Sequence, residues 1–115
     1  FNIMSNVYKN AFYDPTSTAQ STVYTCNSTA RAIVQNIQLT NTGGSKVVQA
    51  SIYDNSASTT YLIAYASITG PTICNVAKGP IILEENDSLL LDTTDTSGIS
   101  ATVSILEINR GLIGN

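Results

Sequence analysis

Hydrophobic and polar residues alternate along three long stretches of the chain. The clearest is residues 99–108, where Ala101, Val103 and Ile105 alternate with serine and threonine, and residues 47–54 show the same spacing. Because successive side chains of a strand point to opposite faces, a spacing of two predicts strands with one mostly apolar face. A helix would distribute the same residues around its circumference.

The third stretch is less regular. In residues 31–40 the spacing places Ile33, Ile37 and Leu39 on one face, interrupted by Gln35. We still expect a strand here, with its more apolar side toward the core.

Five shorter apolar stretches complete the pattern. They cover residues 21–25, 59–66, 72–76, 80–84 and 88–92. Segments such as NTGG and KGP separate the stretches, and these residue types favour turns. About eight strands recurring every 8 to 12 residues indicate an all-β protein, built as an antiparallel sandwich or barrel. A jelly-roll or immunoglobulin-like β-sandwich fits best.

The length of the chain favours a single domain. Its 115 residues are too few for two independent cores. We expect an extended N-terminal arm over residues 1–20, a β-sandwich domain over 21–109 and a short C-terminal tail over 110–115.

The expected arm carries the aromatic residues Tyr8, Phe12 and Tyr13 among polar residues, without clean periodicity. Aromatic side chains on an arm need an apolar groove, either on this chain or on the next one. All three are candidate interface residues.

Charge is sparse, at 11% of residues, and the net charge is −3. The basic residues are scattered singly, at Lys9, Arg31, Lys46, Lys78 and Arg110. Affinity for nucleic acid grows with the number of phosphates neutralised, so no nucleic-acid partner is expected. An acidic membrane surface is disfavoured for the same reason, and no apolar run approaches the length of a membrane-spanning helix.

One residue type on which much enzyme chemistry depends is missing. The chain has no histidine, which excludes imidazole-based catalysis and imidazole metal sites, and it has no glycine-rich phosphate loop. Glu84, Glu85 and Asp87 fall at one short turn, where a solvated turn is favoured over a glycosidase acid–base pair. Asp92 and Asp95 do not have the spacing of an EF-hand calcium loop. We expect no enzyme activity, no cofactor and no metal.

Two cysteines, Cys26 and Cys74, have no second cysteine or histidine at metal-ligand spacing. Buried free thiols are the favoured interpretation, because a domain of this size folds without a covalent cross-link. One disulfide between them is the alternative.

Three tyrosines lie on neighbouring predicted strands, at Tyr53, Tyr61 and Tyr65. They are candidates for a patch that stacks on a glycan or binds a protein. Cross-strand aromatic pairs that only stabilise the sheet are the commoner alternative.

Several segments, taken in order, resemble small virion proteins of tailed phages, especially marine phages of cyanobacteria. They are MSNVYKNAF at positions 4–12, TVYTC at 22–26, IQLTNT at 37–42, LEENDS at 83–88 and VSILEI at 103–108. The resemblance implies a β-sandwich that decorates or connects parts of a particle in many symmetry-related copies, and it implies no catalytic residues.

The expected function is therefore that of a non-catalytic virion structural protein. Its partners would be copies of itself and other virion proteins, and its location the virion, assembled in the host cytoplasm. Capsid decoration is preferred over a neck or tail position, because a compact domain with an arm suits a surface with many equivalent sites. A glycan- or receptor-binding module of a fibre is the alternative from another class.

Overall fold

A computed structural model describes residues 2–112, which form nine β-strands and no helix. The strands are β1 (Asn2–Tyr13), β2 (Ser21–Thr25), β3 (Ala30–Asn41), β4 (Lys46–Asp54), β5 (Thr59–Ile68), β6 (Thr72–Asn75), β7 (Ile81–Leu83), β8 (Ser88–Thr93) and β9 (Ile99–Leu112). Each stretch that the alternation predicted as a strand is one, and β1 is the ninth.

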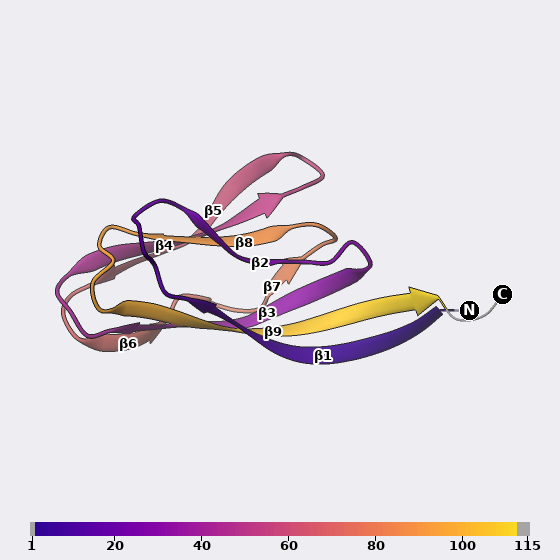
Figure 1. Ribbon diagram of the computed structural model, residues 1–115, viewed down its shortest axis with the longest axis horizontal. Helices are drawn as coiled ribbons and strands as arrows, with labels where there is room; N and C mark the ends of the chain where they lie inside the picture. Colours follow the sequence, from indigo (N-terminus) through magenta and orange to yellow (C-terminus); the bar gives the residue numbers. More distant parts are fainter. Residues whose placement is uncertain (1, 113–115) are drawn as a thin grey trace.

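The strands form two antiparallel sheets that pack as a sandwich (Figure 1). The first sheet has the order β1-β9-β3-β6, with β7 also paired to β3, and the second has the order β2-β8-β4-β5. The all-β sandwich expected from the sequence is confirmed.

The core lies between the two sheets. The first sheet contributes Ile37, Leu39 and Ile105, and the second contributes Leu89 and Leu91, all exposed by 1% or less. The alternation of the sequence thus places every second side chain of these strands in the interior.

Ile33 does not share the face of Ile37 and Leu39, contrary to the simple spacing. The register of β3 against β9 shifts between Val34 and Asn36, which marks a β-bulge. Before the bulge Val34 is buried and Ile33 is partly exposed, and after it Ile37 and Leu39 are buried. An extra residue in one strand reverses which positions face the core.

The N-terminal segment lies on this chain's own sheet. Strand β1 pairs with β9 along its whole length, from Asn2 opposite Leu112 to Tyr13 opposite Ala101. Pairing of β3 with β9 ends at Asn109, so the start of β1 and the end of β9 continue as a two-stranded ribbon that projects from the sandwich (Figure 1). The tail boundary expected after residue 109 falls inside β9, and residues 113–115 lie outside the described residues.

A buried polar network fastens one end of the sandwich. The Lys46 Nζ donates hydrogen bonds to Asn41 Oδ1 and to the Ser97 carbonyl, both at 2.7 Å, and Lys46 is only 4% exposed. The Asn41 Nδ2 donates to the carbonyls of Gly44 and Gly70. These bonds join the β3–β4, β5–β6 and β8–β9 connections.

Asp87 has the same role for two other connections. Its buried carboxylate accepts hydrogen bonds from the backbone N–H groups of Asn55 and Glu84, both at 3.0 Å. The β4–β5 turn is thereby joined to the β7–β8 turn.

Candidate assembly interface

The sandwich has free strand edges, which are the places where another chain can pair. Strands β2, β6 and β7 are short edges of five, four and three residues, and β2 also has a register shift. Strands β1 and β5 are the long edges, with 12 and 10 residues. Short edges offer few backbone groups for pairing with another chain, so the long edges β1 and β5 are the candidate assembly edges.

Strand β5 exposes large apolar side chains. The exposed fractions are 52% for Tyr61, 57% for Leu62, 38% for Ile63 and 62% for Tyr65. Soluble proteins usually protect such an edge with charged residues, especially lysine, or with proline. No charged residue occurs anywhere in positions 55–77.

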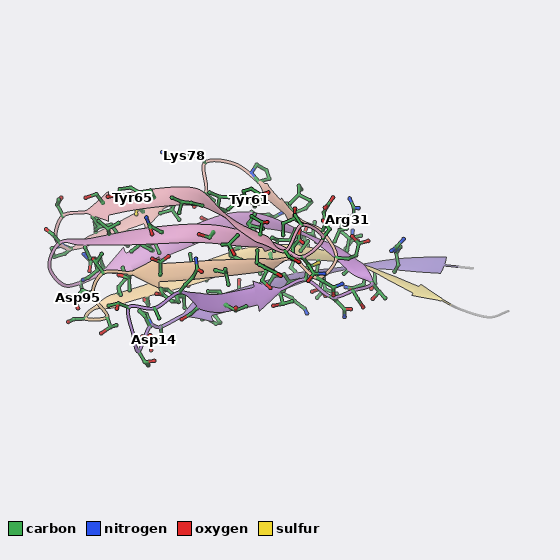
Figure 2. The ribbon with its side chains drawn as sticks, turned by 90° about the horizontal axis from the view of Figure 1, so that it is seen from above. Asp14, Arg31, Tyr61, Tyr65, Lys78 and Asp95 are labelled. Carbon is green, nitrogen blue, oxygen red and sulfur yellow. The ribbon has the colours of Figure 1, made fainter. Side chains whose placement is uncertain are left out.

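The three candidate tyrosines of the second sheet do not form one cluster. Tyr61 lies opposite Ile52, which packs against the core, so Tyr61 is on the inner face of the sheet. Tyr65 lies between two alanines that pack on the core, and Tyr53 follows Ile52, so both are on the outer face. Figure 2 shows Tyr61 and Tyr65 at separate positions along the molecule.

Tyr53 and Tyr65 are also separated along the sheet. Tyr65 is opposite Gln49, four residues before Tyr53 on β4, which corresponds to about 13 Å at roughly 3.3 Å per residue. The two outer-face rings are therefore too far apart to stack together on one sugar ring.

A groove of about 350 Å³ lies beside β5. It is lined by Ile52, Asp54, Tyr61, Ile63, Ile82, Glu84 and Asp87. Apolar residues and three carboxylates line this groove together, and the bulge opposite Ala50 and Ser51 is where β5 departs from regular pairing.

On β1 the three candidate aromatics separate into two groups. Tyr8 and Phe12 are 77% and 70% exposed, whereas Tyr13 is 4% exposed and belongs to the core. Tyr13 thus differs from the expected docking role, because its position in the strand alternation points it inward. Tyr8 and Phe12 remain the available aromatics.

Sequence reasoning missed a row of apolar residues on the outside of the first sheet. Tyr8, Leu106, Ile33 and Ile82 lie opposite one another on β1, β9, β3 and β7, and we call them the outer apolar row. Ile82 is 53% exposed, so the row is open to solvent at both ends. Only the pairing register, which the sequence does not display, brings the four residues together.

A charged group lies beneath β1. Glu107 on β9 is 5% exposed, accepts a hydrogen bond from the Tyr24 hydroxyl and pairs with the Lys9 Nζ at 3.2 Å. The Tyr24 hydrogen bond, followed by contacts with Asn109 and Lys9, holds the pKa of Glu107 below its ordinary value despite burial. Burial and the same hydrogen bond raise the pKa of Tyr24. The network connects β1, β2 and β9.

The acidic turn is engaged in ion pairs. Glu85 pairs with Arg31 at 3.3 Å and Arg110 at 3.4 Å, and Glu84 lies 3.7 Å from Arg31. Asp87 bonds two backbone amides of the turns, and the two glutamates connect their turn to the arginines of β3 and β9. Within residues 2–112 no three potential ligands among Cys, Asp and Glu come together as a metal site.

Both cysteines are free thiols, as favoured from the sequence. Cys26 is fully buried, and burial followed by the nearby Glu107 raises its pKa to about 11. Cys74 on the edge strand β6 is only partly buried, which differs from the expectation of two buried thiols.

Among the described residues, no helix has the length and apolarity needed to span a membrane.

Comparison with known proteins identifies the fold. No protein-family model and no curated protein sequence matches the chain. A chain from the capsid of Helicobacter pylori bacteriophage KHP30 is 10% identical with a TM-score of 0.57, and the match covers 98% of this chain and 100% of that one. A chain of the infectious bursal disease virus particle is 11% identical with a TM-score of 0.56; the match covers 93% of this chain but only 30% of that one.

A third similar structure is a subunit of Bacillus endospore appendages, described as disulfide-linked pili. It is 8% identical with a TM-score of 0.52, and the match covers 94% of this chain and 87% of that one. At these identities the likeness is one of fold. The chain therefore shares a β-sandwich fold with chains of two viral capsids and with a subunit of a bacterial appendage.

Proposed function

We propose that this chain is a non-catalytic structural subunit of a virus particle, and that it decorates the capsid. The observation that carries the proposal is the exposure of large apolar side chains on both long edge strands. Monomeric soluble proteins rarely leave extended apolar surface uncovered, and such surface marks contacts with other proteins. The similar sandwiches in viral capsids support the proposal.

The outer face of the first sheet suits attachment to a neighbouring virion protein. Tyr8 of the outer apolar row and Phe12 project from β1, and aromatic side chains dominate the energetics of many interfaces. Between them on the same strand lies Asn10, which is polar. Contact through this face would bury the aromatic rings, while the Lys9–Glu107 ion pair lies toward the inner face.

Particle incorporation tests this proposal. Deleting residues 1–13 would remove a whole strand of the first sheet and Tyr13 from the core, so substitution is the better experiment. The double variant Tyr8→Thr and Phe12→Thr keeps a strand-forming residue at both positions while removing the rings. We expect a folded chain that is depleted from purified particles.

The matched control is Asn10→Thr, which changes the same face of the same strand but removes no apolar area. Wild-type levels of the double variant in particles would contradict the proposed attachment by β1. Quantitative mass spectrometry of particles also separates the two locations: a copy number near that of the major capsid protein indicates decoration, and a few copies indicate the neck or tail.

A further inference from the structure

Strand β5 differs from every other described edge in being both long and uncharged. Strand β1, of similar length, carries Lys9, and the remaining edges have at most five residues. In β5 all ten residues are neutral, and so are the residues on either side from position 55 to 77. Of the features that normally prevent strand pairing between chains, this edge has neither short length nor charge nor proline, and has only the bulge at Ile63.

We propose that two copies of this chain pair through their β5 edges, antiparallel, to form a twofold dimer. The two four-stranded sheets would then join into one continuous sheet across the dimer. This inference names the first partner of the structural subunit proposed above, and so rests on that proposal for its biological setting.

Charge favours a second copy as the occupant. Each chain has a net charge of −3, so most encounters between copies are repulsive. Strand β5 itself is neutral, so two copies can pair along it without opposing charges on the paired strands, while the carboxylates of Asp54 and Glu84 lie in the groove beside it. A basic partner segment would find no acidic residue on the strand itself.

The pleat of β5 limits the possible register. Tyr61 and Ala64 face the core, and Leu62 and Tyr65 face outward. The bulge residue Ile63 lies between Leu62 and Ala64 and restores this alternation. A twofold axis between Leu62 and Ile63 keeps like faces together. It sets Tyr61 opposite Ala64 of the other copy and Thr60 opposite Tyr65, with the two Leu62 side chains near the axis on the outer face.

The exposed side chains of β5 supply about half of the area that a stable interface buries. Four large side chains that are about half exposed offer roughly 400 Å² per copy, taking ~150–250 Å² for each aromatic ring. A stable interface buries about 800 Å² per partner. The backbone edge and the flanking threonine and serine side chains would supply the remainder.

Opposite charges at Leu62 test the dimer. We expect the wild-type chain to sediment as a dimer, and Leu62→Lys and Leu62→Glu to raise the dissociation constant roughly tenfold or more, because like charges would meet at the axis. An equimolar mixture of the two variants should dimerise again. The control Ile73→Lys places the same charge on an exposed residue of the β6 edge and should leave the dimer intact.

A wild-type chain that stays monomeric over the accessible concentration range would overturn the pairing, and so would a dimer that tolerates Leu62→Lys. Loss of the dimer in Ile73→Lys would place the interface elsewhere and also overturn it. If the Leu62 variants do not fold, hydrogen exchange of the wild type decides: alternate β5 amides must gain protection as concentration rises.

Protection of β5 that arises only on adding another virion protein would identify a different occupant and overturn pairing between copies. A monomeric chain that still enters particles would contradict the dimer alone. Normal dimerisation with no chain in particles would contradict the virion role alone, so the two failures are distinguishable.

Discussion

Strands β9 and β5 have similar apolar sequences but different surroundings. Strand β9 lies between β1 and β3, and its alternate residues Val103 and Ile105 are at most 1% exposed. Strand β5 has a partner on one side only, curls away from the sandwich in Figure 1, and leaves Tyr61 and Leu62 more than half exposed. Apolar β-branched residues make both segments strands, but the number of neighbouring strands decides whether those residues form core or surface.

The same substitution on the two strands should give the largest contrast. Ile105→Ala is expected to lower the free energy of unfolding by about 3 kcal/mol, because it leaves a cavity in a packed core. Ile63→Ala, at a residue 38% exposed, should cost below about 1 kcal/mol. Urea unfolding followed by circular dichroism measures both, and equal costs would mean that β5 is as enclosed as β9.

The turn before β9 should be the next most sensitive position. Gly98 has a φ of +71°, and a Cβ there would lie 2.8 Å from Thr42 Oγ1 and 3.0 Å from the Gly43 backbone nitrogen. Gly98→Ala is therefore expected to destabilise the chain by about 2 kcal/mol. Gly44→Ala is the control, since a Cβ at Gly44 meets nothing within 4 Å. A change in melting temperature that is the same for both variants would argue against strain at Gly98.

The buried Glu107 carboxylate of β9 should make the stability of the chain depend on pH, contributing about 1 kcal/mol at neutral pH. The folded pKa of Glu107 is lowered, so its stabilising contribution is complete above the ordinary glutamate pKa of about 4.3 and is lost as the pH falls through the lower folded value. Glu107→Gln should make the free energy of unfolding depend less on pH across this acidic range. The urea midpoint is measured at several pH values from neutral downward, and its slope against pH is compared between the variant and the wild type.

The control for the pH experiment is Glu84→Gln. Its side chain is 55% exposed and lies 3.7 Å from Arg31, so its removal should leave the slope nearly unchanged. An unchanged slope in Glu107→Gln would mean that other carboxylates carry the acid sensitivity.

The turn before β5 should show the smallest effect, with the opposite sign. Ser58 has a φ of 51°, in the region that favours glycine. Ser58→Gly is expected to raise the free energy of unfolding by about 0.5 kcal/mol, since relief of strain exceeds the added freedom of the unfolded chain. Thermal unfolding of the variant beside the wild type measures the shift, and a clear loss of stability would contradict strain at this turn.

Much of the fold follows from local pattern. The spacing of two in residues 99–108 and the turn residues between stretches predicted the strands, because side-chain alternation is a property of each strand alone. The inward position of Tyr13 and the partly exposed Ile33 were not predicted. The first depends on β1 joining the sheet, and the second on a bulge whose position is set by pairing with β9.

The candidate interface likewise combines features that the sequence predicts with features that only the fold produces. The sequence by itself determined that the chain is an all-β sandwich with few charges and no histidine, because composition and side-chain periodicity do not depend on how the strands are arranged. Only the tertiary structure decided that β5 is a free edge, that Tyr53, Tyr61 and Tyr65 lie apart, and that the outer apolar row exists. Strand order and register bring together residues distant in the chain, and they depend on the packing of the whole molecule.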